Sequence, residues 1–312
     1  MILVFGSLNI DLVFRVEALP RAGETVTARH FQTLPGGKGA NQATAAARAG
    51  AEVAMAGCVG DDGFGRSLLA ALGGNGVDVR LVRRVSAATG CAVVAVDAQG
   101  ENQILVASGA NALARAADVP EALLAPRTTL LLEREVDVLE SAALAGRAKA
   151  RGARVILNLA PMGPVPEELL AASDVLVVNE HEAATLLGGE TAGASAAAAF
   201  AARRGITVIV TLGAEGAIAH RPDGSGLRVG ALALTPVDTT GAGDAFVGVL
   251  AAALDRGKAL ADALRRASVA AGLACLKEGA QSALPTAEEI DEALTRLGPA
   301  TPLGRREAKH RM

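Results

Sequence analysis

The sequence contains no tryptophan and no tyrosine, and aromatic residues make up only 2% of its 312 residues. Proteins that hold single-stranded nucleic acid stack its bases on aromatic side chains, so this scarcity argues against that class. The formal net charge is −3 at neutral pH, which offers no basic surface to nucleic acid or to an anionic membrane. Any phosphate group would therefore be bound by a local site and not by the field of the whole protein.

Cysteine is scarce as well. The three cysteines, Cys58, Cys91 and Cys275, are odd in number, and each lies in an apolar segment. This usage is typical of free, buried thiols in a reducing compartment. The four histidines are scattered without the spacing of metal ligands. Neither residue type predicts a disulfide framework or a metal centre.

Long hydrophobic runs are also missing. The alanine-rich segments are interrupted by Arg, Asp or Gly before they reach the roughly 18 apolar residues of a membrane span. The N-terminal stretch MILVFGSLNIDLVF has no basic region and is interrupted by Asn9 and Asp11, so we interpret it as a strand and not as a signal peptide. We expect a cytoplasmic protein that contacts neither a membrane nor nucleic acid.

What the sequence does contain is a regular alternation of short apolar strands and helical segments. Continuous runs of apolar residues, such as 2–5 and 53–59, are typical of strands buried on both faces of a sheet. Strands separated by helices predict a parallel sheet with helices on both faces. We therefore expect an α/β fold in a single domain of residues 1–297. Residues 298–312 show no periodicity and are expected to form a disordered tail.

Two further β-prone regions stand outside this alternation. Each contains two short strand-like segments separated by a turn rich in Gly, Pro or polar residues. We expect two hairpins that join in a small second sheet, formed from about residues 10–32 and 89–107.

Polar residues gather where the predicted strands end. In parallel sheets, ligands bind beyond the carboxyl ends of the strands, so side chains at these positions are candidates for a binding site. Packing alone does not account for the pattern, which includes Asn9, Asp11, Glu135, Asn158, Asn179, Glu182, Thr211 and Asp238.

The most informative stretch is residues 235–254, TPVDTTGAGDAFVGVLAAAL. It reads as a strand-like lead-in, a glycine turn and the start of an apolar helix. The first turn of a helix leaves N–H groups unpaired and carries the positive end of the helix dipole, so anions bind there readily. Asp244 lies in this turn. It is either an acid that only stabilises the helix N-terminus or a base beside an anion site.

Several motifs together resemble the ribokinase branch of the PfkB carbohydrate kinases, over nearly the whole chain from residue 6 to 281. The glycine-rich GGKGANQA at 36–43 resembles the first signature of that family, and DTTGAGDAF at 238–246 resembles the second. Between them, in matching order, lie LEREV at 132–136, NLAP at 158–161, NEHEA at 179–183 and TLGAEG at 211–216. Each motif is weak alone, whereas their order and spacing are specific.

The resemblance implies a Rossmann-like, mostly parallel sheet with a small β-sheet lid over a sugar, and an ATP-dependent kinase. Asp244 matches the catalytic base of the family, and the Gly241–Asp244 turn, with the amides of Ala242 and Gly243, matches its anion hole. The sugar would be bound by residues with donor and acceptor groups that suit hydroxyls, namely Asn9, Asp11, Gly37, Lys38, Asn41 and Glu135, together with Asp244.

On the nucleotide side, the resemblance implies Mg²⁺ near Asn179 and Glu182, held through water. Thr211, Gly213 and the Gly243 amide match positions beside the nucleotide. The family often carries Asn or His near the adenine, where this sequence has Ser268, so the contact with the base departs from the pattern.

Many ribokinases also bind K⁺ beside the anion hole. The matching positions here are Asp238, Thr240, Gly279 and Ala283. Because a serine is often found where this sequence has Ala283, the K⁺ site would rest mainly on backbone oxygens.

The expected function is therefore ATP-dependent phosphorylation of D-ribose to D-ribose 5-phosphate. The family commonly pairs the lids of two subunits, so we expect a homodimer through the β-lid. One alternative is a PfkB kinase for deoxyribose, a nucleoside or another sugar, because the motifs do not determine the lid residues that select the acceptor. Another is a sugar-binding regulator without catalysis, which the presence of Asp244 and both glycines of its turn disfavours. The absence of a complete GxGxxG after the first strand argues against a dehydrogenase.

Overall fold

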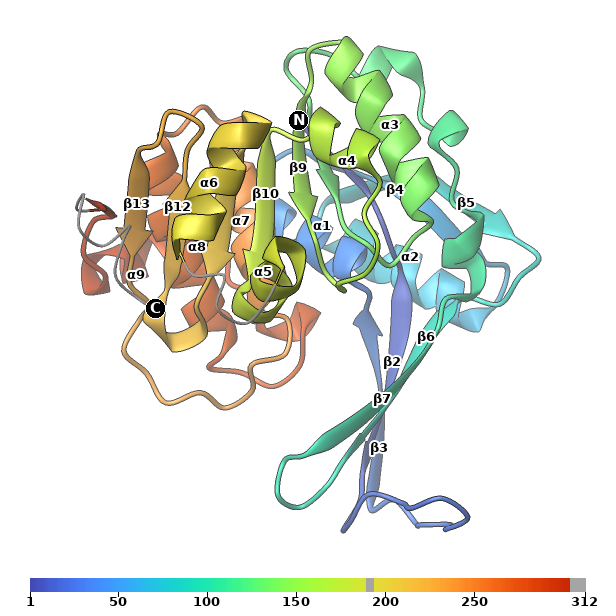
Figure 1. Cartoon of the computed structure of the whole chain (residues 1–312). Coiled ribbons are helices and arrows are strands. Elements are labelled where there is room, and N and C mark those ends of the chain that lie inside the picture. The colour runs from blue at the N-terminus through green and yellow to red at the C-terminus, as the bar shows by residue number, and fades with distance from the viewer. Residues whose placement is uncertain (189–193, 304–312) are drawn as a thin grey trace.

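The computed structural model of the protein describes residues 1–188 and 194–303, and its centre is a sheet of ten strands (Figure 1). The strand order is β14-β13-β12-β11-β10-β9-β8-β1-β4-β5. The strands from β11 to β5 in this order are parallel to one another, and the pairs β11–β12, β12–β13 and β13–β14 are antiparallel. The strands are β1 Ile2–Phe5, β4 Val53–Gly60, β5 Val77–Val85, β8 Thr129–Leu132, β9 Arg154–Asn158, β10 Val175–Asn179, β11 Thr207–Thr211, β12 Ala217–His220, β13 Gly226–Val229 and β14 Thr301–Pro302.

The centre of this sheet is its most apolar part. All four residues of β1 are buried, and so is every residue of β4 and β8, because helices cover both faces of these strands. Strand β1 pairs with β4 on one side and with β8 on the other. The chain thus extends in opposite directions from β1, and the resulting switch point is where α/β sheets bind ligands.

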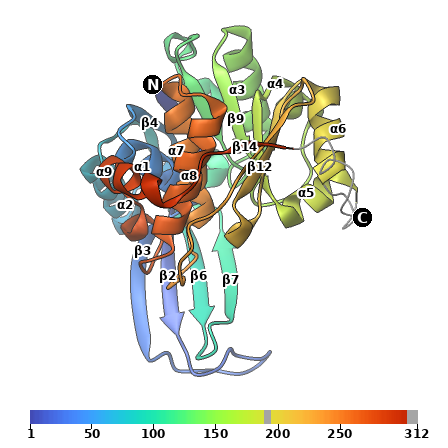
Figure 2. The same cartoon turned by 90° about the vertical axis from the view of Figure 1, so that its left-hand side faces the viewer.

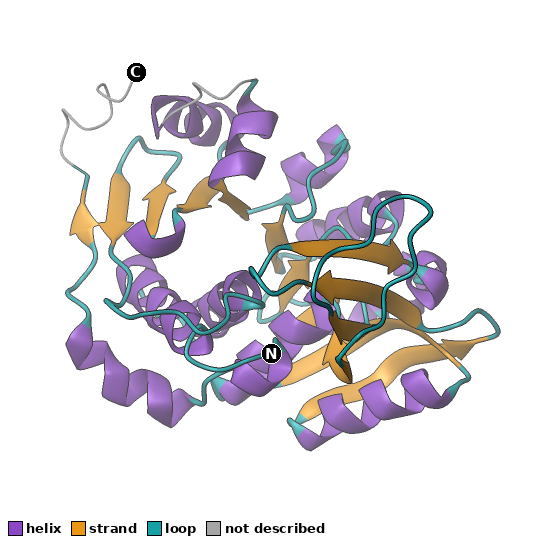
Figure 3. Cartoon of the chain, turned by 90° about the horizontal axis from the view of Figure 1, so that it is seen from below, coloured by secondary structure: helices purple, strands orange, loops and turns teal. Residues whose placement is uncertain are grey.

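Helices lie on both sides of the sheet, as Figure 3 shows from below. One hydrophobic cluster joins the sheet to α1, α2, α7, α8 and α9, and a second cluster joins the opposite face to α3, α4, α5 and α6. The helices are α1 Lys38–Arg48, α2 Gly63–Gly74, α3 Val138–Ala150, α4 Glu167–Ala172, α5 Glu180–Leu187, α6 Ala194–Arg204, α7 Ala242–Asp255, α8 Leu260–Ala274 and α9 Ala287–Ala293. The predicted α/β fold with a mostly parallel sheet is confirmed.

A second sheet of four strands projects from the main body (Figure 2). Its order is β3-β2-β6-β7, and the parallel pair β2–β6 joins the two hairpins. We call this sheet the lid; its strands are β2 Asn9–Arg15, β3 His30–Gly36, β6 Gly90–Val96 and β7 Asn102–Ala107.

Three local predictions differ from the structure. The first lid hairpin was expected to end at about residue 32, but its second strand spans 30–36 and is followed by α1 after Gly37. The sequence pattern also missed β5, whose arginines interrupt the apolar run, and α9. The expected disordered tail is wrong for residues 301 and 302, which pair with β13, and residues 304–312 lie outside the described part.

Several short 3₁₀ turns complete the chain, of which η1 Gly109–Leu113, η4 Gly213–Glu215 and η5 Gln281–Ala283 lie near the sheet ends discussed below. Within residues 1–188 and 194–303, no helix combines the length and apolar character needed to cross a membrane.

Candidate functional site

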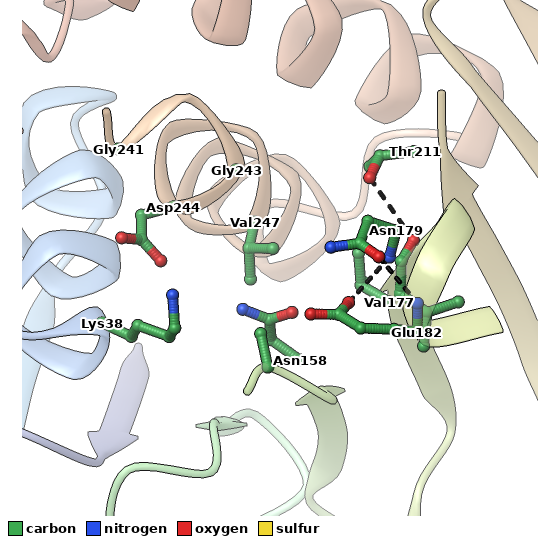
Figure 4. A pocket seen from close by; sticks show the side chains of 12 residues that line it. Lys38, Asn158, Val177, Asn179, Glu182, Thr211, Gly241, Gly243, Asp244 and Val247 are labelled. Carbon is green, nitrogen blue, oxygen red and sulfur yellow. Dashed lines mark hydrogen bonds between the residues drawn. The ribbon is translucent and has the colours of Figure 1, made fainter. Parts of the chain in front are cut away.

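The carboxyl ends of β9, β10 and β11 and the start of α7 enclose a cavity of about 160 Å³ (Figure 4). We call it the first cavity. Eight of the candidate residues named from the sequence line it, from segments far apart in the chain: Lys38, Asn158, Asn179, Glu182, Thr211, Gly241, Gly243 and Asp244. The parallel topology brings them together, because all these strands end at the same edge of the sheet.

The start of α7 is shaped by Gly241, which has a left-handed φ of 76°. A Cβ at this position would lie 3.0 Å from the Cα of Ala280, so the turn requires glycine. The N–H of Ala242, a predicted member of the anion hole, donates to the carbonyl of Thr239 at 3.2 Å. Among the described residues, no acceptor is recorded for the N–H groups of Gly243 and Asp244.

Asp244 is buried in this first turn and is held by two side-chain amides. Its Oδ2 accepts a hydrogen bond from Asn41 Nδ2 at 3.0 Å, and its Oδ1 accepts one from Gln42 Nε2 at 2.9 Å. Burial raises the pKa of Asp244, and the positive charge of Lys38 and the two amides partly oppose this effect. The result is a shielded carboxylate whose basicity exceeds that of an exposed aspartate.

Lys38 extends from the first turn of α1 into the first cavity, where its ammonium points toward Asp244 (Figure 4). Burial alone would lower the pKa of Lys38, but the carboxylates of Asp244, Glu135, Glu133 and Glu182 outweigh it and raise the pKa. The side chain therefore stays positively charged. It brings a cation to a cavity lined mainly by polar groups.

Asn179 and Glu182 form a capping box at the start of α5. Asn179 Oδ1 accepts from the Glu182 N–H, and Glu182 Oε2 accepts from the Asn179 N–H, both at 2.8 Å. Burial raises the pKa of Glu182, although the Asn179 N–H and the charge of Lys38 act in the opposite direction. The motif thus has a structural role, and it leaves Glu182 Oε1 outside the capping bonds.

A second cavity, of about 410 Å³, lies between the lid and the main sheet. Asn9 and Glu135, two of the predicted sugar ligands, line it together with Val106 of β7 and Asn111 of η1. Asn9 Oδ1 accepts a hydrogen bond from Asn111 Nδ2 at 2.7 Å. The side chain of Asn9 is thus fixed, with its carbonyl turned toward Asn111.

A hydrogen-bonded network ties Glu135 to the end of β1. Ser7 Oγ donates to Glu135 Oε2 at 2.6 Å, and the Lys38 N–H donates to the same oxygen at 3.0 Å. The buried Glu133 accepts from the N–H groups of Ser7 at 2.6 Å and of Glu135 at 2.5 Å. Burial and the charge of Glu135 raise the pKa of Glu133, while these two N–H bonds lower it.

Asp11 lies on β2 above this network. Burial and the negative charges of Glu135 and Asp244 raise its pKa to about 7, against the lowering effect of Lys38. Near neutral pH this carboxyl is therefore divided between its protonated and ionised forms. It can act as a donor or as an acceptor toward a hydroxyl.

The remaining predicted residues are more scattered. Asp238 accepts from the N–H groups of Thr240 and Gly279, both at 2.9 Å; burial raises its pKa, but these bonds outweigh that effect and lower it. Ser268 is buried and donates to the carbonyl of Gly230 at 2.5 Å, so its hydroxyl is used inside the fold. The others do not line either cavity: Gly37, Asn41, Gly213 and Ala283.

Sequence reasoning missed four residues that organise this region. Ser7, Gln42, Asn111 and Glu133 are all buried and all hydrogen-bonded to predicted site residues or to the backbone beside them. Gln42 and Glu133 lie within recognised motifs, and Ser7 lies two residues after the end of the first strand. For Asn111, the only indication in the sequence was that a polar residue interrupts an apolar segment.

The chain matches a family model over residues 1–287, described as pfkB family carbohydrate kinase. Among curated proteins, it is 39% identical over 298 residues to a ribokinase of Haemophilus influenzae, covering 93% of this chain and 97% of that protein. It is 37% identical over 296 residues to a ribokinase of Bacillus subtilis, covering 94% and 99% of the two chains.

Solved structures give the same result. A ribokinase of Thermotoga maritima superimposes with a TM-score of 0.88 at 33% identity, covering 94% of this chain and 99% of the other. An Arabidopsis thaliana ribokinase in complex with ribose and ATP superimposes with a TM-score of 0.85 at 35% identity, covering 94% and 98%.

Proposed function

Since this chain belongs to the pfkB family of carbohydrate kinases, we propose that it phosphorylates D-ribose at the 5-hydroxyl, with ATP as the phosphoryl donor. Similarity to ribokinases over more than nine-tenths of the chain supports this acceptor. The structure of the Arabidopsis relative, which is 35% identical, is of a complex with both ribose and ATP.

The observation that carries the proposal is the buried Asp244 carboxylate beside the N–H groups of Gly243 and Asp244 itself. In the proposed reaction, Asp244 accepts the proton of the sugar hydroxyl as the hydroxyl oxygen bonds to the γ-phosphorus. The bond from this phosphorus to the β,γ-bridging oxygen breaks, and ADP leaves with the electron pair. The two N–H groups and the helix dipole stabilise the negative charge that develops on the transferred group. The raised pKa of Asp244 suits a base that works near neutral pH.

The sugar would lie in the second cavity, under the lid. Carboxylates and amides there match the hydroxyls of a furanose, since each can accept or donate in a fixed direction. The proposed ligands are Asn9, Asp11 and Glu135. The backbone at Gly37 and the side chain of Asn41 would complete the sugar site on the side of Asp244. The lid would exclude water, which otherwise competes as a phosphoryl acceptor.

The ATP phosphates would lie in the first cavity. Lys38 lines this cavity with its ammonium turned toward Asp244, so we assign it to a phosphate oxygen in place of the sugar contact that the resemblance implies. Thr211 and the following turn at Gly213 lie on the same side. Ser268 is not assigned to the adenine, because its hydroxyl already bonds to Gly230.

Mg²⁺ fits this cavity through water. The described residues contain no cluster of three carboxylate, His or Cys ligands, and the capping box occupies one oxygen each of Asn179 and Glu182. These two residues would hold the ion through ordered waters. The ion supplies charge neutralisation to the phosphates when bound.

A K⁺ site beside the anion hole is proposed with less side-chain support. Asp238 ties Thr240 to Gly279 through its two oxygens and so fixes the backbone on both sides of the candidate site. Ala283 is buried and offers no side-chain oxygen. The remaining ligands would be backbone carbonyls. Turnover that is equal in Na⁺ and in K⁺ would contradict this site.

The lid is also the proposed dimer surface. Phe31, Ile104, Leu105 and Val106 are half or more exposed, with Leu105 at 73%. A surface of this kind on a projecting sheet is typical of an interaction site. We propose that it pairs with the lid of a second copy.

The test is ADP release from ATP and Mg²⁺ with four acceptors at equal concentration: D-ribose, deoxyribose, fructose and adenosine. We expect kcat/KM to be highest for ribose by at least about tenfold. A preference for another acceptor would transfer the assignment to a different sugar or nucleoside kinase. If the protein binds ribose but phosphorylates none of the four acceptors, the result would favour a sugar-binding regulator.

A further inference from the structure

We propose that Gln42 is a positioning residue for Asp244: its buried amide holds the carboxylate in the orientation in which it accepts the proton of the acceptor hydroxyl. This proposal rests on the proposed role of Asp244 as the base. It concerns a residue that touches neither cavity, because Gln42 is fully buried and lines neither of them.

The first argument is the geometry of the two amides. Asn41 and Gln42 are adjacent on α1, yet each donates to a different oxygen of Asp244, at 3.0 and 2.9 Å. A carboxylate bonded on both oxygens cannot rotate about its terminal bond, so the lone pairs left for a proton point in fixed directions. General-base catalysis depends on that direction as well as on basicity.

The second argument is that the two amides differ in exposure. Asn41 is 6% exposed and belongs to the proposed sugar site, where a hydroxyl can compete for its amide. Gln42 is 0% exposed, and neither water nor substrate reaches its donor. We therefore expect Gln42 to keep its bond to Asp244 throughout turnover.

The third argument is the cost of this arrangement within the fold. Among the described residues, the carbonyl oxygen Oε1 of Gln42 has no hydrogen-bond donor, although it is buried. Leaving such a group without a partner is unfavourable, and an apolar side chain of similar size would avoid this cost. Turning the amide round would place Oε1 against the negative carboxylate. Asn41 Oδ1 likewise has no donor among the described residues, so both amides leave a carbonyl unpaired while their N–H groups bind Asp244.

The approach of the two helices makes the contact possible. A Cβ at Gly248 of α7 would lie 2.5 Å from the backbone carbonyl oxygen of Gln42 and 2.6 Å from the Cβ of Ala45. Glycine at this position lets α1 and α7 pack closely, one turn beyond Asp244. The side chain of Gln42 then reaches across the helix interface to the carboxylate.

The charged groups that face Asp244 come from three elements: Lys38 on α1, Asp11 on β2 and Glu135 after β8. They remain in place when Gln42 is replaced. The hydrogen bonds of Gln42 and Asn41 lower the pKa of Asp244, so loss of the Gln42 donor raises it.

The test compares wild type with Gln42→Met, which keeps the length of the side chain and removes the donor. We expect kcat to fall about tenfold, the sugar KM to change less than about twofold, and the acidic limb of the pH profile to move up by about one pH unit. The control is Thr44→Val, which removes another fully buried polar group of α1 whose bond goes to Ala40. An unmoved acidic limb in Gln42→Met, or equal losses in both variants, would overturn the proposal.

Two further measurements keep the proposal decidable. Gln42→Glu preserves size but sets a second carboxyl against Asp244, so its acidic limb should move further than that of Gln42→Met. If Gln42→Met does not fold, an unmoved limb in Gln42→Glu overturns the proposal. If wild type phosphorylates no acceptor, the proposed function fails. The positioning of Asp244 can then still be tested by ¹³C NMR, with the Asp244 carboxyl signal assigned by comparison with Asp244→Asn. The pKa of Asp244 has to be higher in Gln42→Met than in wild type.

Discussion

Asn111 Nδ2 donates a hydrogen bond to Asn9 Oδ1 at 2.7 Å, although 102 positions separate the two residues. Asn111 also accepts from the Leu8 N–H at 2.9 Å through its own Oδ1. One buried amide thus fixes both the backbone before Asn9 and the direction of its side chain. In the proposed function, the amino group of the Asn9 side chain faces the sugar in the second cavity.

This relationship predicts that Asn111→Asp weakens sugar binding more than it weakens the fold. The aspartate keeps an acceptor for the Leu8 N–H but has no donor for Asn9. We expect the sugar KM to rise about tenfold, the scale of one hydrogen bond, with a smaller change in kcat. Asn111→Leu, which loses both bonds, should in addition lower the thermal midpoint. An unchanged KM in both variants would show that Asn9 does not depend on Asn111.

Asp244→Asn should lower kcat by about 10²-fold or more, because an amide cannot accept the proton at the reaction site. The matched control is Asp255→Asn at the opposite end of α7, where the carboxylate bonds to Thr129 and the N-terminus. This control should keep kcat even if it lowers stability. Near-normal turnover in a folded Asp244→Asn protein would remove Asp244 from the role of base.

Asp11→Asn should stabilise the protein, and more so at alkaline than at acidic pH. The pKa of Asp11 is raised from 3.8 to about 7, so between these values the folded state holds a proton that the unfolded state has released. Stability therefore falls as the pH rises from about 4 to about 7, and the full penalty applies above pH 7. Asn carries no charge and avoids it.

We expect the gain in thermal midpoint of Asp11→Asn over wild type to be larger at pH 8 than at pH 5, by about 2 °C or more. Asp262→Asn, which changes an exposed carboxylate in the first turn of α8, is the control and should show no such pH dependence between these values. A gain of the same size at both pH values would indicate that Asp11 is not protonated in the folded state near pH 6.

Leu105→Glu should convert the expected dimer to a monomer, because a charge would have to be buried against the lid of the second copy. Light scattering after size-exclusion chromatography measures the mass directly. Leu139→Glu on α3 is the matched control, since Leu139 is 68% exposed but lies outside the lid. A wild-type monomer, or a dimer that survives Leu105→Glu, would place the interface elsewhere.

The parts of the fold that the sequence predicted are those that depend on local patterns. Apolar runs at β1, β4 and β8 follow from burial on both faces, and the glycine turn before α7 follows from its backbone geometry. Strand β5 was missed because it alternates apolar residues with arginines, as expected at an edge of the sheet. The edge strand β14 was missed because its short pairing with β13 has no periodic signal.

The sequence by itself determined the α/β class, the motifs at the strand ends and the carboxylate at a helix N-terminus, since these depend on neighbouring residues and on the rule that parallel strands end together. Only the tertiary structure decided which polar groups of the candidate site bond within the fold and which are left to bind a ligand. It bonded the Ser268 hydroxyl to the Gly230 carbonyl and brought the Gln42 amide to Asp244. Such bonds join residues distant in sequence, and their partners are set by how helices and strands pack, which no local pattern encodes.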